Sequence, residues 1–107
     1  MGMKPALRSP QARADIDDAI DWYLAQTPHM VAPFVDALEK AVAQIQRSPG
    51  TGSPRYALEL AIPGLRCWTL TKFPFGLFYI EQDEHLWVIR LVHMKRDIPA
   101  SLQGDPV

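Results

Sequence analysis

The side chains that could do chemistry in this chain gather in and after its β-rich C-terminal half. They are Arg66, Arg90, His93, Lys95 and Arg96. A guanidinium group suits two-point contact with a phosphate or a carboxylate, and a histidine can exchange a proton near neutral pH. Such a cationic set could contact another macromolecule or assist a phosphate reaction.

Other kinds of site find little support in the sequence. The histidines His29, His85 and His93 are far apart, and Cys67 is the only cysteine, so no metal-ligand spacing is present. No glycine-rich phosphate loop follows a predicted strand, because Gly50-Thr51-Gly52 leads into a proline-containing loop. We therefore expect neither a metal nor a cofactor.

Length and charge narrow the possible classes. The 107 residues form one domain, with an ordered core over about 5–100. We expect no signal peptide and no membrane-spanning run, and a lone cysteine is typical of a reducing, cytoplasmic setting. With eleven Lys and Arg against twelve Asp and Glu, the net charge of −1 argues against strong direct binding to nucleic acid.

Three runs of β-branched, aromatic and aliphatic residues predict strands at 65–71, 75–82 and 86–93. The breaks between them contain Lys72-Phe73-Pro74 and the polar segment 82–85. A parallel crossover needs a dozen or more residues, so breaks this short predict an antiparallel meander.

The N-terminal half predicts a helical hairpin. Ser9-Pro10 is a helix start signal, and a second helix should begin near residue 30 and end at Ser48-Pro49-Gly50. The short extended segment 5–8 is predicted to be an edge strand, whereas 51–64 could form a turn of helix or an extra strand piece. The predicted order is β-α-α-β-β-β: an α+β domain with an antiparallel sheet and the hairpin packed on one face.

Strand alternation predicts which face each arginine occupies. In the last strand Arg90 shares a face with Val88 and Val92. The other face carries Trp87, Ile89, Leu91 and His93. If that apolar set packs on the helices, Arg90 points to the open face with Arg66, and Arg90→Ala should cost less than ~0.5 kcal/mol of stability.

Each of these residues also has an ordinary structural role. An arginine on a sheet is often solvated or ion-paired, and Glu81 or Asp97 could pair with Arg66 or Arg90. His93 could be a hydrogen-bonded histidine at a strand end. The segment Lys95-Arg96-Asp97 could be a solvated turn, and Trp22 could cover the rim of the core rather than anchor a partner.

Several short motifs together carry a family resemblance. They are Ser9-Pro10-x-Ala12-x-x-Asp15-Ile16-x-x-Ala19-Ile20-x-x-Tyr23, Ser48-Pro49-Gly50-x-Gly52, Leu65-Arg66, Lys72-Phe73-Pro74-Phe75-Gly76-Leu77-Phe78-Tyr79 and Ile89-Arg90-Leu91-Val92-His93-x-x-Arg96-Asp97-Ile98-Pro99. In this order, over roughly residues 5–102, the chain resembles the RelE/ParE superfamily of toxins from bacterial type II toxin–antitoxin systems. The likeness is closest to the ParE-like branch.

The resemblance implies a cytoplasmic toxin that inhibits DNA gyrase without being an enzyme. It also implies a toxin–antitoxin hetero-oligomer, in which a ParD-like antitoxin wraps across the hairpin and the sheet. The target-binding residues would be Arg66, Arg90, His93, Lys95 and Arg96. The antitoxin-binding residues would be Trp22, Trp68 and Trp87, because three tryptophans are more than so small a core requires.

Two alternatives stay open at this point. RelE-like members cut mRNA on the ribosome, and Arg66, Arg90 and His93 could supply part of that chemistry. The chain could also be a binding module that has lost toxicity and keeps only its antitoxin contact.

Overall fold

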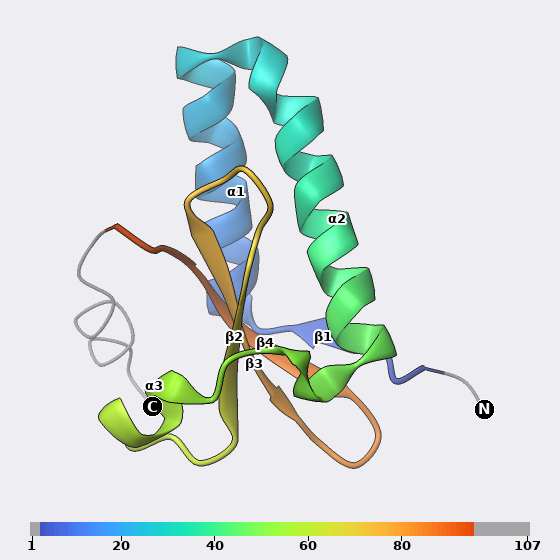
Figure 1. The fold of residues 1–107 in the computed structure, drawn as a ribbon. Helices are drawn as coiled ribbons and strands as arrows, with labels where there is room; N and C mark the ends of the chain where they lie inside the picture. Colours follow the sequence, from blue (N-terminus) through green and yellow to red (C-terminus); the bar gives the residue numbers. More distant parts are fainter. Residues whose placement is uncertain (1–2, 96–107) are drawn as a thin grey trace.

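A computed structural model describes residues 3–95 of the chain. Figure 1 shows two long helices standing as a hairpin above a sheet. The helices and strands are β1 (Ala6–Arg8), α1 (Pro10–Gln26), α2 (Val31–Arg47), α3 (Arg55–Glu59), β2 (Leu65–Thr69), β3 (Phe75–Glu81) and β4 (Leu86–His93), with 3-10 turns η1 (Pro28–Met30) and η2 (Pro49–Thr51). The predicted end of the ordered core and the segment from Arg96 onward lie outside the described residues.

The sheet has the strand order β1-β4-β3-β2. The antiparallel meander of β2, β3 and β4 is confirmed. The predicted edge strand also forms, but it pairs with β4 in parallel, with Ala6 opposite Leu86. The hairpin and two strands separate β1 from β4, which leaves ample chain for a parallel connection. The α+β fold is therefore as predicted, with a mixed sheet instead of a wholly antiparallel one.

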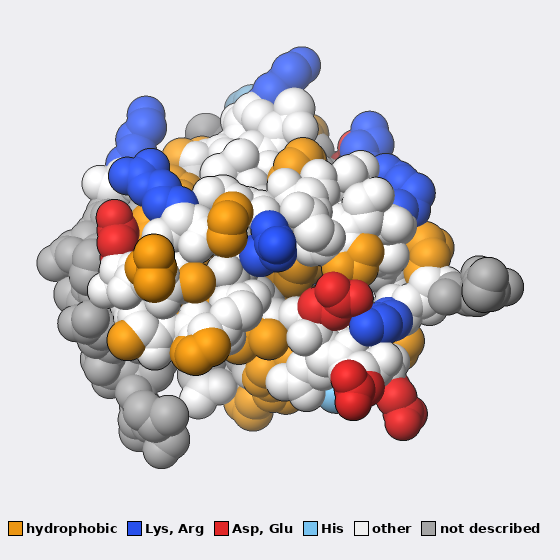
Figure 2. Space-filling view, turned by 60° about the horizontal axis from the view of Figure 1, so that its bottom comes forward, with side chains coloured by type: hydrophobic (Ala, Val, Ile, Leu, Met, Phe, Trp, Pro, Cys, Tyr) orange, Lys and Arg blue, Asp and Glu red, His pale blue; other side chains and the backbone are white. Residues whose placement is uncertain are grey.

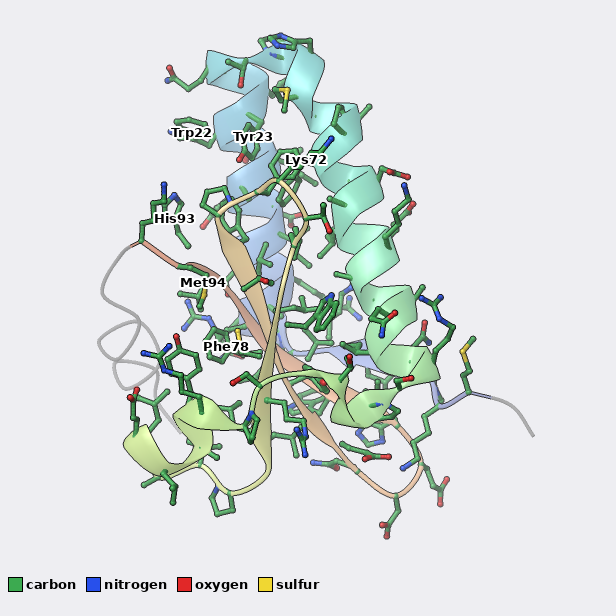
Figure 3. The ribbon with its side chains drawn as sticks, viewed as in Figure 1. Trp22, Tyr23, Lys72, Phe78, His93 and Met94 are labelled. Atoms are coloured by element: carbon green, nitrogen blue, oxygen red, sulfur yellow. The ribbon has the colours of Figure 1, made fainter. Side chains whose placement is uncertain are left out.

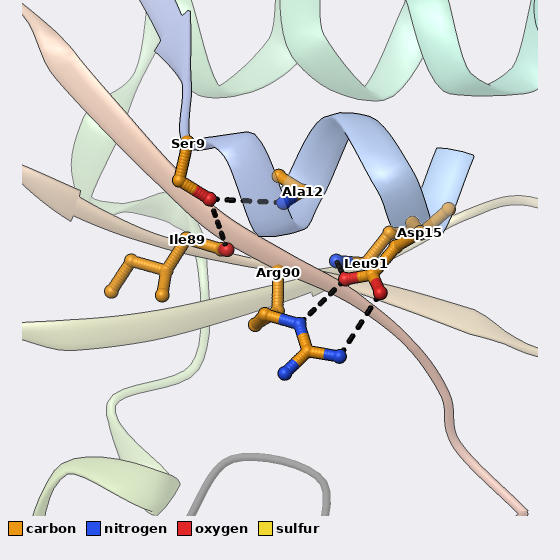
Figure 4. A network of polar contacts seen from close by, with 6 residues as sticks. All are labelled: Ser9, Ala12, Asp15, Ile89, Arg90 and Leu91. Carbon is orange, nitrogen blue, oxygen red and sulfur yellow. Dashed lines mark hydrogen bonds and ion pairs between the residues drawn. The ribbon is translucent and has the colours of Figure 1, made fainter. Parts of the chain in front are cut away.

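A serine cap fixes the start of the first helix. The Ser9 hydroxyl accepts a hydrogen bond from the Ala12 amide at 2.9 Å and donates one to the Ile89 carbonyl at 2.6 Å (Figure 4). Pro10 follows in the first turn, where its missing amide hydrogen costs nothing. The cap therefore starts α1 and ties that start to β4.

The main core lies between the hairpin and one face of the sheet. Each helix buries one stripe, at the three- and four-residue spacing that the sequence predicted. The stripes are Ala12, Ile16, Ala19 and Tyr23 from α1, and Phe34, Leu38, Ala41 and Ile45 from α2. Tyr23 and Phe34 pack with Phe73 and Phe75 in an aromatic cluster near the upper end of the sheet.

The other face of the sheet is less open than the sequence predicted. The segment 51–64 forms α3 and one isolated bridge between Ser53 and Cys67. It covers a second small core of Leu60, Leu65, Cys67, Phe78 and Val92. Both structures weighed for this segment therefore occur, and together they close part of the face expected to be free.

A β-bulge in β4 overturns the predicted face assignment. Phe78 pairs with Arg90, whereas the next residue, Tyr79, pairs with Val88, so Ile89 is the extra residue. Leu86, Val88 and Leu91 consequently pack with the hairpin, and Ile89 packs on the second core. Placing Trp87 and Ile89 on the helix side was wrong, because simple alternation does not allow for an inserted residue.

None of the helices within residues 3–95 combines the length and the apolar character that a membrane crossing would require.

Candidate functional site

A groove of about 570 Å³ runs between α1 and the last residues of β4. Its walls include Trp22 and Tyr23 from the helix and Phe75 and His93 from the strands. Figure 3 shows Trp22 and His93 projecting on the same side of the molecule, one above the other. We call this the Trp22 groove.

Arg90 lines the Trp22 groove but is held by an ion pair. Its Nε donates to Asp15 Oδ2 at 2.7 Å, and its Nη2 donates to Asp15 Oδ1 at 3.0 Å (Figure 4). The two side chains are only 15% and 16% exposed. The prediction that Arg90 is open was wrong, although its pairing with Phe78 keeps it on the side of the sheet opposite the hairpin. Asp15 is a partner that the sequence did not suggest, and Asp97, one of the two acids considered, lies outside the described residues.

The same carboxylate also completes the edge of the sheet. Asp15 Oδ2 accepts a hydrogen bond from the Leu91 amide at 3.0 Å, at a point beyond the last pairing of β1 with β4. An edge amide left without a partner in a half-buried site would be costly. Asp15 thus fastens α1 to β4 through both a side chain and the backbone. The sequence motif contained Asp15 but gave no sign of this partner.

His93 sits at the end of β4, half-buried. Its ring packs edge-on against Phe75, with centroids 5.3 Å apart, and its Nδ1 accepts a hydrogen bond from the Lys95 amide at 3.3 Å. This is the structural role weighed for a strand-end histidine. Lys95 is exposed, whereas Arg96 lies outside the described residues.

Arg66 serves a different part of the molecule. Its Nη1 donates to the carbonyls of Gly52 at 2.7 Å and Gly50 at 3.2 Å. It pairs across the strands with Tyr79, which packs under the hairpin, so Arg66 lies on the helix side of the sheet. The predicted open position of Arg66 was therefore wrong. Among the described members of the cationic set, Arg90 and His93 alone line the Trp22 groove.

Tyr79 holds the same loop from beneath, a role that the sequence did not suggest. Its hydroxyl donates to the Pro49 carbonyl at 2.6 Å and accepts from the Gly52 amide at 3.0 Å. Burial raises the pKa of this phenol above its usual value. A Cβ at Gly52 would stand 2.6 Å from that hydroxyl, so only glycine fits there.

The three tryptophans occupy three separate places. Trp22 is 54% exposed in its groove and stacks edge-on with Tyr23. Trp68 lines a second groove between α2 and β2, and Trp87 lies beside His85. The exposure of Trp22 favours a partner anchor over a rim cover.

Charges are spread over the surface. On the face seen in Figure 2, the Lys and Arg side chains of the described residues are distributed over the surface, some next to one another and some beside Asp or Glu. Strong direct nucleic-acid binding needs clustered cations, and the expectation that it is absent stays a prediction.

Comparison with known proteins agrees with this arrangement. The family model described as "ParE toxin of type II toxin-antitoxin system, parDE" matches residues 7–98. Among solved structures, one titled "Chromosomal ParDE TA system from P. aeruginosa" aligns with a TM-score of 0.71 and 23% identity. That alignment covers 85% of this chain and 96% of the other, and it supports the fold. No curated protein matches.

Proposed function

Because this chain belongs to the ParE family of toxins from type II toxin–antitoxin systems, we propose that it inhibits DNA gyrase and is silenced by a cognate antitoxin. The observation that carries this proposal is the family match over residues 7–98, nearly the whole folded domain. The family membership suggests the kind of activity, which is inhibition by a toxin. The geometry of the chain suggests where each partner binds.

The Trp22 groove is the proposed antitoxin site. An exposed indole beside Tyr23 and Phe75 offers apolar area, and Asp15 and Arg90 give the groove a polar wall. Exposed aromatic anchors with a polar border are typical of protein interfaces. An antitoxin helix or extended segment seated there would bury Trp22 without any change in the fold.

The target contact is proposed at the end of β4. The Arg66 guanidinium donates hydrogen bonds to the Gly50 and Gly52 carbonyls, and the Arg90 guanidinium forms an ion pair with Asp15. Both arginines are therefore poor candidates for a direct target contact. His93, exposed Lys95 and the following Arg96 remain in the proposed set. His93 and Lys95 lie where the chain leaves the sheet, so a partner could approach them from outside.

A ribosome-dependent nuclease is less well supported. That mechanism was considered for Arg66, Arg90 and His93 acting together. Arg66 does not line the groove that contains the other two, and Arg90 is paired with Asp15. We therefore propose no second function.

The test is a supercoiling assay with purified gyrase. The wild-type chain should inhibit supercoiling, and a molar equivalent of the antitoxin from the neighbouring reading frame should restore it. Lys95→Glu should weaken inhibition at least tenfold. The matched control is Arg13→Glu, an exposed residue of α1 that lines neither groove, which should leave inhibition unchanged. Growth arrest with unaffected gyrase and new mRNA ends would overturn the proposal in favour of the nuclease.

A further inference from the structure

On the outer edge of β2, the backbone N–H and C=O of Thr69 have no strand to pair with among residues 3–95, and we call this pair of groups the Thr69 rung. Cys67 exchanges two backbone hydrogen bonds with Ser53, at 2.8 and 3.0 Å. Thr69 lies two residues further along the strand, so its N–H and C=O point to the same outer side as those of Cys67, and Thr69 is exposed. No loop or side-chain hydrogen bond among residues 3–95 reaches these two groups. An edge of this kind is a template for an added strand.

The chain itself turns away before it can fill this rung. Continuing the antiparallel bridge past Ser53 would bring Thr51 opposite Thr69. The Thr51 amide instead donates to the Ser48 carbonyl at 2.9 Å, and its hydroxyl accepts from Gln44 at 3.3 Å. The turn η2 thus lifts the backbone toward α2, and the rung stays available.

Beside this edge lies a second groove of about 650 Å³, between α2 and β2. Small residues of α2, Ala37 and Ala41, line one side, and Trp68 and Phe73 line the other. Small side chains on the helix leave room for a backbone to pass, and the rings offer apolar contact. We call this the Trp68 groove. Figure 3 shows Lys72 on the β2–β3 loop, close to the hairpin.

The charge of the Trp68 groove points to an acidic occupant. Three cations line it, Lys40, Arg47 and Lys72, against one carboxylate, Asp36. Asp36 pairs with Lys40 at 3.0 Å, whereas Arg47 donates to the neutral Gln44 amide and to no carboxylate among residues 3–95. The groove is therefore positive on a chain whose net charge is −1. A second copy docked edge to edge would bring like cations together, which disfavours a dimer here.

We propose that the antitoxin adds an acidic, extended segment to the edge of β2, through the Thr69 rung and the Trp68 groove. This rests on the proposed function and gives the antitoxin a second contact, on the opposite side of the hairpin from Trp22. Backbone hydrogen bonds would set the direction of the added strand. Acidic side chains facing Lys72 and Arg47 would set its specificity.

The first test compares two substitutions at one position by measuring the dissociation constant of the full-length antitoxin. Thr69→Pro removes the outward N–H, and an edge strand tolerates proline on that side. It should raise the dissociation constant about tenfold. Thr69→Val keeps the backbone groups and the side-chain shape, and it should change the constant less than twofold. Lys72→Glu should weaken antitoxin binding, and the dissociation constant of this variant should change less with salt concentration than that of the wild-type chain.

A second measurement needs no substitution. In the wild-type complex, the Thr69 amide should become protected against hydrogen exchange, by at least tenfold over the free chain. Hydrogen exchange of the Thr69 amide still tests the proposed β2 contact if Thr69→Pro fails to fold.

The outcomes separate the two proposals. Tight antitoxin binding with unchanged Thr69 exchange and unchanged constants for Thr69→Pro and Lys72→Glu would overturn the β2 contact and leave the proposed function intact. Lost gyrase inhibition with unchanged antitoxin affinity would also overturn it, because the groove would then serve the target. No antitoxin binding by the wild-type chain would overturn both.

Discussion

Asp15 does more for this fold than any other single acidic residue among those described. Its carboxylate engages the Arg90 guanidinium twice and the Leu91 amide once. The partners are 75 and 76 positions away in the chain, so no local pattern could reveal the pairing. The sequence predicts the helix and places Asp15 in its second turn. That Asp15 faces β4 follows only from the fold.

The corrected position of Arg90 changes the expected effect of mutation. Asp15→Ala removes a two-point ion pair from the half-buried Arg90 guanidinium and takes the side-chain acceptor from the Leu91 edge amide, so we expect a loss of about 2 kcal/mol in unfolding free energy. Asp15→Asn keeps an acceptor for Leu91 and should lose about half as much. Urea unfolding at constant m-value measures both. The double variant Asp15→Ala with Arg90→Ala should be less destabilised than the sum of the single variants. Additive losses would contradict a direct pair.

The buried thiol predicts how stability depends on pH. Burial raises the pKa of Cys67 to about 12 from 9.0. A raised pKa means that the folded chain keeps a proton that the unfolded chain releases, so this stability is complete below pH 9.0 and falls as pH rises toward 12. One such group gives a slope of up to ~1.4 kcal/mol per pH unit. Burial raises the pKa of Tyr23 and Tyr79 as well, which adds to the loss above pH 10.0.

Unfolding at a series of pH values checks this expectation. Between pH 8 and 10 the wild-type chain should lose stability, while Cys67→Ala, although less stable at every pH, should give a flatter curve. Equal slopes for the two proteins would mean that the thiol ionises freely in the folded state.

At the scale of elements, local sequence signals predicted the helices and strands well, but features that depend on contacts distant in sequence were not predicted. Caps, prolines and apolar periodicity place the helix and strand ends within a residue or two, because those signals act over one turn or one strand. The bulge at Ile89 depends on how β4 pairs with β3, and it reversed the predicted faces of Trp87 and Ile89. The parallel pairing of β1 likewise depends on the whole chain path.

The junction between β1 and α1 is one such element. Ser9 is 3% exposed, and its hydroxyl serves both the Ala12 amide and the Ile89 carbonyl. Ser9→Ala should therefore cost about 2 kcal/mol, at the upper end for an N-cap. The control is Ser48→Ala at the start of η2, where the side chain makes no cap bond, and the change should be within ~0.5 kcal/mol. Equal effects in thermal or urea unfolding would contradict the assigned double role.

At the scale of the whole molecule, the hairpin divides the surface in two. The Trp22 groove lies on the α1 and β4 side, and the Trp68 groove lies on the α2 and β2 side. Trp87 lies on neither, because it alternates with Leu86 and Val88 onto the opposite face of the sheet. The sequence predicted a common role for the three indoles from their number, but their separation depends on the packing of the hairpin over the sheet. One antitoxin chain that reaches both grooves must wrap around the hairpin.

Quenching of tryptophan fluorescence can test whether the antitoxin wraps around the hairpin. Three variants that each keep one indole, the others replaced by phenylalanine, report on Trp22, Trp68 and Trp87 separately. Antitoxin should reduce acrylamide quenching of the Trp22 and Trp68 variants several-fold, because both grooves become covered. It should leave the Trp87 variant nearly unchanged. Protection of Trp87 with the other two still quenched would instead place the antitoxin on the opposite face of the sheet, against Ile80 and Ile89, and both groove assignments would fall.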